Sequence, residues 1–403
     1  MTIRPILPLF AVALACTPGA PTYTLSDIEF SAPPGSMGPY VVATRDGGAL
    51  MSWWDRIGDR TYALRVADRI DGTWSEPTTV VEGADMFANW ADIPSITELD
   101  NGTWVAHWPQ KTAASTYAYH VMLSKSTDRG KTWSEAFVAH DDMSPTEHGF
   151  VSVVPWEGGA ALVWLDGRQM ATEGAGDGGY ESQGSMSVRF TTLGADAVRH
   201  ADILIDNRTC ECCTTALTTT SSGLVAAYRD RSEAEIRDIA IVRFDGSEWS
   251  EPKHVWQDNW HYPGCPVNGP QLTSRGDTVA IAWFTAPENV SRVQVAFSTD
   301  GGATFSEPVR VDDGDPSGRV DVELLGDGSV IVSWLEKTDP DAEIRARRVT
   351  PGGGMDDSWL VAPTSAARGS GFPRMTRVGD ELLFAWTLVG PEGGVHVASV
   401  TVN

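Results

Sequence analysis

One repeated unit recurs seven times along the chain and restricts the fold more than any other feature. Each copy joins an apolar strand, a polar turn with Gly or Asp, and a second apolar strand that ends in an aromatic residue. The copies are "PYVVATRDGGALMSWW", "IPSITELDNGTWVAHW", "FVSVVPWEGGAALVW", "CTTALTTTSSGLVAAY", "GPQLTSRGDTVAIAW", "RVDVELLGDGSVIVSW" and "FPRMTRVGDELLFAW". After most copies come an alternating strand and a short edge strand, so each unit predicts a four-stranded meander. Such units bury their faces by stacking around an axis, which predicts an all-β chain folded as a β-propeller with seven blades.

The last copy lacks an outer strand, because the chain stops at "GVHVASVTVN". The segment "TYTLSDIEF" before the first copy has the length and alternation of a strand. We therefore expect an N-terminal strand to complete the seventh blade and residues 22–403 to form a single domain. A six-bladed ring is the alternative, and it would leave one full hairpin unexplained.

Two turns after third strands share one pattern, "STDRGKTW" (residues 126–133) and "STDGGATF" (residues 298–305). In each, the carboxylate of Asp128 or Asp300 can accept bonds from the N–H groups of the following turn. The aromatic residue, Trp133 or Phe305, is expected to fill the space between two blades. Both Asp residues are therefore expected to be structural.

These turns resemble the Asp-box, or BNR repeat, of the sialidase superfamily. The resemblance covers the whole mature chain as architecture and implies a sialidase-like propeller, a fold whose members often bind or hydrolyse glycans. It also implies that the Asp-boxes lie on the rim, away from any active site. True sialidases carry a Phe-Arg-Ile-Pro motif near the N-terminus and have six blades, whereas the nearest string here is "GFPRM" (residues 371–375) in the last unit.

The first 20 residues resemble an export signal, with Arg4 followed by the apolar stretch "ILPLFAVALA" and then Cys16. "ALAC" resembles the lipobox of bacterial lipoproteins, although Ala13 stands where Leu is commonest. It implies that Cys16 is acylated and anchors the chain to a membrane, in the periplasm or at the outer membrane. Secretion after cleavage at Ala20 is the alternative. Either route leads to an oxidising compartment.

The net negative charge of the chain limits the kinds of partner that it can bind. The chain has 54 acidic and 30 basic residues and a formal net charge of −24. Such a surface repels phosphate backbones and anionic lipids, so we expect neither nucleic-acid binding nor membrane contact other than the lipid anchor.

Arginines gather in the loops that precede the innermost strands and in those between second and third strands, which meet on one face of a propeller. Arg319 and Arg374 begin innermost strands, and with Arg229 they could bracket an anionic substrate through bidentate bonds. The alternative is that such arginines pair with carboxylates and hold blades together. The alternating charges of "YRDRSEAEIRD" (residues 228–238) favour this second interpretation for that loop.

A glycosidase also needs an acid with a raised pKa and a second carboxylate or an activated tyrosine. Asp92 and Glu147 precede the innermost strands of adjacent units and are the candidates for this pair, with Tyr228 as a third catalytic candidate. The alternative is that either carboxylate caps a turn.

The four remaining cysteines lie between neighbouring units on the same face, in "CECC" (Cys210, Cys212 and Cys213) and at Cys265. Two disulfides, one of them between Cys265 and the cluster, are favoured by export and by the even count. The alternatives are a copper or zinc site, with His261 or His148 as added ligands, and a redox-active bond between Cys212 and Cys213.

Two functions follow from these observations. The first is an exported propeller that binds or hydrolyses glycans, acidic ones above all, at the arginine-lined face, as an exo-sialidase-like glycoside hydrolase and without a cofactor. The second is a non-catalytic binding or metal-handling propeller that uses the cysteine cluster. In both, the partner is a glycan or another small anionic ligand.

Overall fold

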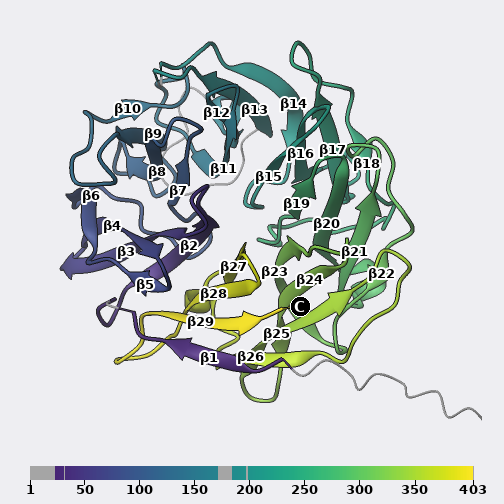
Figure 1. Cartoon of the computed structure of the whole chain (residues 1–403). Coiled ribbons are helices and arrows are strands. Elements are labelled where there is room, and N and C mark those ends of the chain that lie inside the picture. The colour runs from purple at the N-terminus through teal and green to yellow at the C-terminus, as the bar shows by residue number, and fades with distance from the viewer. Residues whose placement is uncertain (1–22, 31, 171–183, 197, 403) are drawn as a thin grey trace, which may run out of the picture.

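Seven antiparallel sheets stand in a ring around a central axis (Figure 1). The computed structural model describes residues 23–402 except 31, 171–183 and 197, so Cys16 and the export signal lie outside the described residues. The innermost strand of each blade begins at one face of the ring, which we call the top face. The prediction of an all-β propeller with seven blades is confirmed.

The blades follow one another along the chain, and in blades 1–6 the innermost strand comes first in sequence. Blade 1 contains β2 (Met37–Ala43), β3 (Ala49–Gly58), β4 (Thr61–Ile70) and the two outer strands β5 (Thr73–Trp74) and β6 (Thr78–Gly83). Blade 2 contains β7 (Ser95–Glu98), β8 (Trp104–Lys111), β9 (Tyr119–Ser126) and β10 (Phe137–Val138). Blade 3 contains β11 (His148–Trp156), β12 (Gly159–Asp166), β13 (Met186–Leu193) and β14 (Ile203–Thr209). Blade 4 contains β15 (Ala216–Thr220), β16 (Gly223–Arg229), β17 (Ile239–Phe244) and β18 (Lys253–His254).

Blade 5 contains β19 (Gln271–Arg275), β20 (Thr278–Thr285), β21 (Arg292–Ser298) and β22 (Val309–Arg310). Blade 6 contains β23 (Pro316–Leu324), β24 (Val330–Lys337), β25 (Ala342–Val349) and β26 (Trp359–Thr364). Blade 7 contains β27 (Arg374–Val378), β28 (Glu381–Thr387), β29 (Val395–Thr401) and β1 (Leu25–Ile28). Single 3-10 turns occur at Arg168–Met170, Pro287–Asn289 and Arg368–Ser370. Within the described ranges, no helix has the length and hydrophobicity to cross a membrane.

Strand β1 closes the ring. It pairs antiparallel with β29, with Leu25 opposite Val400 and Ile28 opposite Val397. The expected N-terminal strand is therefore present as the outer strand of blade 7, where Figure 1 shows the first strand beside the last. Closure in this way gives blade 7 four strands, as in blades 2–6.

Buried aromatic residues near the ends of the second strands explain why the repeated unit ends in Trp or Tyr. Trp108, Trp164 and Trp334 are almost fully buried, and each indole N–H donates to a side chain two residues further on. The acceptors are Gln110, Asp166 and Glu336 at 2.6–3.1 Å. A buried indole needs such an acceptor, so the aromatic residue and its polar neighbour recur together.

The two turns at residues 126–133 and 298–305 have the expected geometry. The carboxylate of Asp128 accepts bonds from the backbone N–H and the hydroxyl of Thr132, at 2.9 and 2.7 Å, and Asp300 accepts the same two bonds from Thr304. Hydrogen bonds from the threonine hydroxyl and other turn groups lower the pKa of both carboxyls to about 2. Trp133 packs on the cores of blades 1 and 2, and Phe305 packs on those of blades 4 and 5. These turns therefore join blades.

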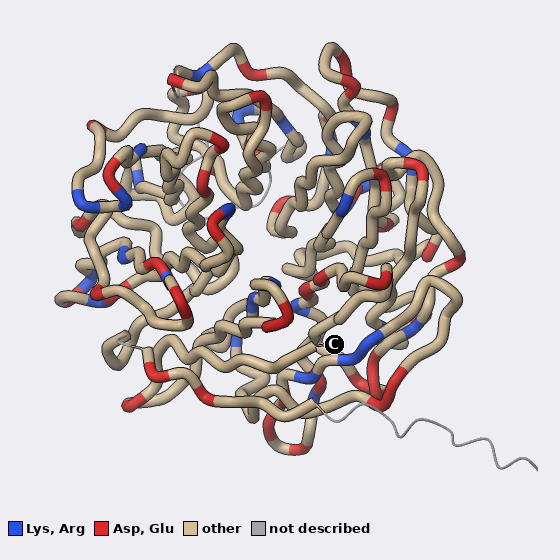
Figure 2. The backbone as a smooth tube through the Cα atoms, in the orientation of Figure 1, with Lys and Arg blue, Asp and Glu red and all other residues tan. Residues whose placement is uncertain are grey.

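Acidic residues are spread around the whole ring (Figure 2). The net negative charge therefore belongs to the whole molecule and not to one blade. Local function must depend on the groups that line the channel.

Candidate functional site

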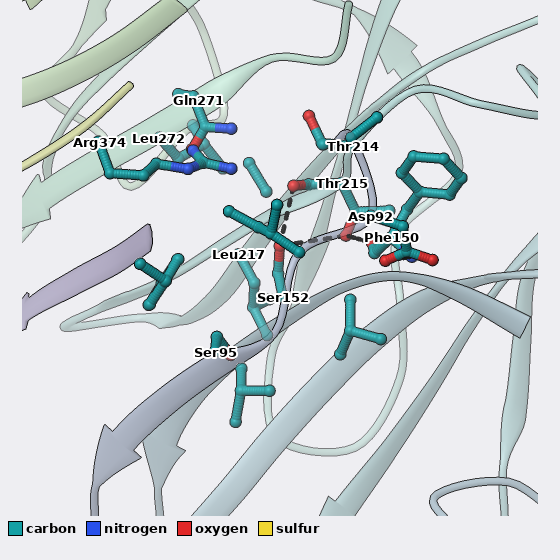
Figure 3. Close-up of a pocket in the computed structure, with 16 residues that line it drawn as sticks. Asp92, Ser95, Phe150, Ser152, Thr214, Thr215, Leu217, Gln271, Leu272 and Arg374 are labelled. Atoms are coloured by element: carbon teal, nitrogen blue, oxygen red, sulfur yellow. Dashed lines mark hydrogen bonds between the residues drawn. The ribbon is translucent and has the colours of Figure 1, made fainter. Parts of the chain in front are cut away.

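A cavity of about 90 Å³ lies in the channel near the top face. Its walls come from the innermost strands of several blades and from the segments that precede them. Arg374 and Gln271 lie at one end and Asp92 with Phe150 at the other, with Ser152 and Thr215 between them (Figure 3). At roughly 30 Å³ per water, the cavity has room for a few waters or for one polar group of a larger ligand.

Three residues that line this cavity each carry one buried polar atom without a hydrogen-bond partner: Asp92 Oδ2, Thr214 Oγ1 and Arg374 Nε. Buried polar atoms in proteins are almost always satisfied by protein or water. These unsatisfied atoms in its walls favour a polar occupant for the cavity.

Asp92 is held against the backbone of the next blade. Its Oδ1 accepts the N–H of Phe150 at 2.9 Å, while Oδ2 is buried beside Gly149. Phe150 has a left-handed backbone with φ of 53°, at a bulge in β11. Gly149 permits this approach, since a Cβ there would stand 1.9 Å from Asp92 Oδ2. Burial raises the pKa of Asp92 to about 7, although bonds from Phe150 and Tyr119 oppose the shift.

The same arrangement recurs between blades 5 and 6, with an amide in place of the acid. Asn268 Oδ1 accepts the N–H of Arg319 at 2.7 Å, again at a bulge with a left-handed residue, and Gly318 makes the matching close approach. Asp92 and Asn268 each stand three residues before an innermost strand. The inter-blade bond therefore needs only an oxygen acceptor, and the ionisable group at Asp92 is additional to it.

Glu147 lies close to Asp92, and Tyr119 connects the two residues. The Tyr119 hydroxyl donates to Glu147 Oε1 at 2.8 Å, and the Tyr119 ring stacks on Phe87. Burial raises the pKa of Glu147 to about 8, and the charge of Asp92 adds to the shift. The expected pair Asp92 and Glu147 thus lies in one cluster, the acid cluster Asp92–Tyr119–Glu147.

Sequence reasoning missed Tyr119. The signal was its place at the start of a third strand on the top face, directly after a loop that reaches the same face. Only the Asp92 end of the acid cluster lines the cavity. Asp92 can therefore exchange a proton with a ligand there, and Tyr119 can relay a proton between the two carboxyl groups. A pKa near 7 suits an acid–base group that works at neutral pH.

The candidate Tyr228 lies elsewhere. It is the blade 4 counterpart of the buried tryptophans in the second strands, 1% exposed, and its hydroxyl donates to Asp206 Oδ2 at 2.6 Å. Burial, together with Asp206, raises the Tyr228 pKa far above its usual range. The structure therefore gives Tyr228 a core position and does not place it with Asp92 and Glu147.

The three candidate arginines have different environments. Arg374 lines the cavity, near Asp321 and over the rings of Tyr40 and Phe372. Arg319 lies over the ring of Trp90, and its Nη1 donates to the backbone and side chains of residues 367–371 in blade 7. Burial, with the nearby Arg368, lowers the Arg319 pKa to about 10.

Arg229 differs from the expectation of a substrate contact, because it is fully buried. Its guanidinium donates to the carbonyl oxygens of Asn268, Arg237 and Phe284 at 2.5–2.7 Å, and burial lowers its pKa to about 9. Arg229 thus ties blades 4 and 5 together and does not reach the cavity. Of the three arginines, the structure brings Arg374 alone to the cavity lining.

The cysteines form two disulfides, Cys210–Cys213 and Cys212–Cys265. The second joins the segments that lead into blades 4 and 5, as expected from the repeat. Glu211, between the bonded cysteines, pairs with Arg231 and Arg237 of the charged loop. The charges of that loop are therefore satisfied internally. Paired cysteines offer no thiolate, so metal binding there stays a prediction for the reduced chain.

Comparison with known proteins agrees with this geometry at the level of fold. Neither a protein-family model nor a curated protein matches the sequence. Among solved structures, an ulvan lyase of polysaccharide lyase family PL25 aligns over 92% of this chain and 95% of its own, with a TM-score of 0.60 and 10% identity. The endosialidase of phage phi92 aligns over 94% of this chain and 69% of its own, with a TM-score of 0.53 and 9% identity. The fold is that of a sialidase-like propeller.

A protein of unknown function from Dyadobacter fermentans also shares the sialidase-like propeller fold, over 96% of this chain and all of its own, with a TM-score of 0.52 and 13% identity. At such low identity these likenesses establish the fold alone. Function has to be argued from the acid cluster and the cavity.

Proposed function

We propose that this chain is an exported propeller that binds and cleaves acidic glycans at the top of its channel. The observation that carries the proposal is a cavity lined by Asp92, Thr214 and Arg374, each of which has one buried polar atom without a hydrogen-bond partner. A glycan supplies hydroxyl groups for the first two atoms and a carboxylate or sulfate for the arginine. The PL25 ulvan lyase was also solved with a -[GlcA(1-4)Rha3S]- ligand, an acidic sugar chain, which supports this choice of substrate class.

The acid cluster supplies the chemistry in this proposal. Asp92 holds or accepts the proton at the scissile position, and Tyr119 passes it to or from Glu147. Arg374 orients the acidic group of the sugar. Because two carboxyl groups with pKa values of about 7 and 8 share one hydroxyl, one proton can be held between them near neutral pH. Export is supported by the two disulfides, which persist in oxidising compartments.

A substrate panel tests the proposal. Purified protein is incubated with sialosides, aryl glycosides and uronate-containing polysaccharides, and products are followed as new reducing ends and as the ultraviolet absorbance of unsaturated uronates. The second readout separates a lyase from a hydrolase. Cleavage of at least one acidic substrate is expected, and Asp92→Asn should reduce it by roughly 10²–10⁴-fold.

Glu323→Gln is the matched control. Glu323 lies in the innermost strand β23, and burial raises its pKa to about 8, but it does not line the cavity. Activity should survive this change. Equal losses in both variants, or no cleavage of any acidic substrate, would refute the assignment.

A further inference from the structure

Five metal-binding side chains meet beside the acid cluster, in the gap between blades 2 and 3. We call them the histidine–aspartate cluster: His120, His140, His148, Asp142 and Asp166. One ring nitrogen from each histidine lies within 4.8 Å of the others, and the ligand atoms of Asp142, His148 and Asp166 are equally close. His120 and His148 immediately follow Tyr119 and Glu147 in sequence, but none of the five residues belongs to the proposed catalytic groups.

The surroundings of His148 Nε2 favour a cation, because two carboxylates face it. Its Nδ1 faces the carbonyl oxygens of Tyr119 and Thr146 at 3.2 and 3.1 Å and therefore carries a hydrogen. Its Nε2 faces carboxylate oxygens of Asp142 at 2.9 Å and Asp166 at 3.7 Å. A lone pair there would be repelled by both, so either a proton or a cation stands between them. Backbone carbonyls on Nδ1 are also the usual outer partners of a histidine that binds a metal through Nε2.

His120 supplies a second, independent observation. Its ring is 5.3 Å from that of His148, between centroids, and its Nδ1 is buried without a hydrogen-bond partner. A buried imidazole nitrogen normally has a partner. His140 is already engaged at both nitrogens, by the carbonyl of Asp142 and the N–H of Val121, and it stacks on His148. It therefore positions the His148 ring.

The local charge also favours a dication. Around the cluster, the carboxylates of Asp141, Asp142, Asp166 and Asp202 are linked by ion pairs to Arg168, Arg189 and His148. Four carboxylates against two guanidinium groups leave two negative charges before His148 is counted. Arg168 and the indole of Trp164 bind Asp166, as outer partners bind a ligating carboxylate.

We propose that His148, Asp142 and Asp166, whose ligand atoms lie within 4.8 Å of one another, bind one divalent transition-metal ion of the zinc class, and that the neighbouring His120 supplies the fourth ligand. Two imidazoles and two carboxylates are a ligand set that suits zinc, and imidazole disfavours magnesium and calcium. Binding places the ion where the proton between His148 and Asp142 would otherwise lie, and that proton is released to solvent. The site cross-links blades 2 and 3 next to Glu147, which immediately precedes His148 in the sequence.

Zinc titration of the full chain tests the site. Protein treated with a chelator and dialysed is titrated with ZnCl₂ in a calorimeter at neutral pH, and the retained metal is measured by mass spectrometry. One ion per chain is expected. Asp142→Asn, which removes a half-buried charge and keeps the shape, and His120→Ala should each weaken binding by roughly 100-fold or more. His396→Ala, an exposed histidine in blade 7, should leave the affinity unchanged.

Cobalt spectroscopy of the unmutated protein keeps the test independent of any folding defect. Co²⁺ at the histidine–aspartate cluster should show visible ligand-field bands without thiolate-to-cobalt charge transfer. Charge-transfer bands would place the metal at the cysteines and overturn the proposal. Failure to bind Zn²⁺ at millimolar concentration would also overturn it, and so would equal affinity in Asp142→Asn, His120→Ala and the control.

Discussion

Replacement of Asp92 by Asn separates its structural role from its ionisable one, because the chain already uses an amide at the equivalent position. Asn268 makes the same inter-blade bond to Arg319 that Asp92 makes to Phe150. The amide oxygen of Asp92→Asn can accept the Phe150 N–H, so the ring should fold. What the variant loses is a buried carboxyl group.

The pKa of that carboxyl sets the size of the effect. In the folded chain it is about 7, against 3.8 for an ordinary aspartate. The folded state therefore binds more protons than the unfolded state between these values, and stability falls as the pH rises through this window. The whole shift corresponds to about 4 kcal/mol, of which about 3 kcal/mol falls between pH 5 and pH 8. Asp92→Asn should lack this loss.

Urea unfolding followed by tryptophan fluorescence measures the difference. Wild type and Asp92→Asn are compared at pH 5 and at pH 8, and the wild type should lose about 3 kcal/mol more than the variant between the two. Acids outside the acid cluster, such as Glu323, contribute equally to both proteins and cancel, whereas the pKa of Glu147 falls in the variant because the Asp92 charge is removed. If both proteins lose the same free energy of unfolding between pH 5 and pH 8, burial does not raise the pKa of Asp92. The acid–base role assigned to Asp92 then fails.

Three further predictions concern Tyr119, the two arginines Arg229 and Arg374, and the two disulfides. Tyr119→Phe should lower the turnover of an acidic glycan by roughly 10²–10⁴-fold with little change in KM, because it breaks the proton relay; unchanged turnover would exclude the relay. Arg229→Lys should destabilise the ring by about 3 kcal/mol or more in urea unfolding, since it leaves buried carbonyl groups unpaired. Arg374→Lys should instead weaken ligand binding with little loss of stability. The reverse pattern would exchange the structural and ligand-binding roles of the two arginines. Cys265→Ser should cost about 4 kcal/mol, because Cys212–Cys265 spans 53 positions, and Cys213→Ser about 2 kcal/mol, because Cys210–Cys213 spans three. Equal costs in urea unfolding would show that loop length does not set the stabilisation.

The architecture was predictable because the sequence repeats. The number of copies of the repeated unit predicts seven blades. The missing outer strand of the last copy predicts that the N-terminal segment "TYTLSDIEF" closes the ring. Neighbouring blades also bring cysteines and carboxylates together wherever they precede successive innermost strands. The disulfide at Cys265 and the closeness of Asp92 and Glu147 could be predicted for this reason.

The direction and burial of individual side chains could not be predicted. Arg229 and Arg374 both stand on the top face in the repeat, but Arg229 points into the contact with blade 5, where carbonyl oxygens take up its donors. Tyr228 ends a second strand next to a charged loop, but it packs in the core as the tryptophans of other second strands do. His120, His140 and His148 are far apart in their loops and strands, and each alone has the pattern of a packed residue. Only the contact between blades brings the three histidines together.

Closure by β1 also determines when this protein can finish folding. Residue 25 must find residue 400, so the ring cannot close until the last strand has been made. Blades 1–6 therefore cannot lock into a closed ring while β29 is still absent. The same pairing places β1 at the outer edge of blade 7. A force that pulls on β1 would therefore open the ring at a single seam, the pairing of β1 with β29.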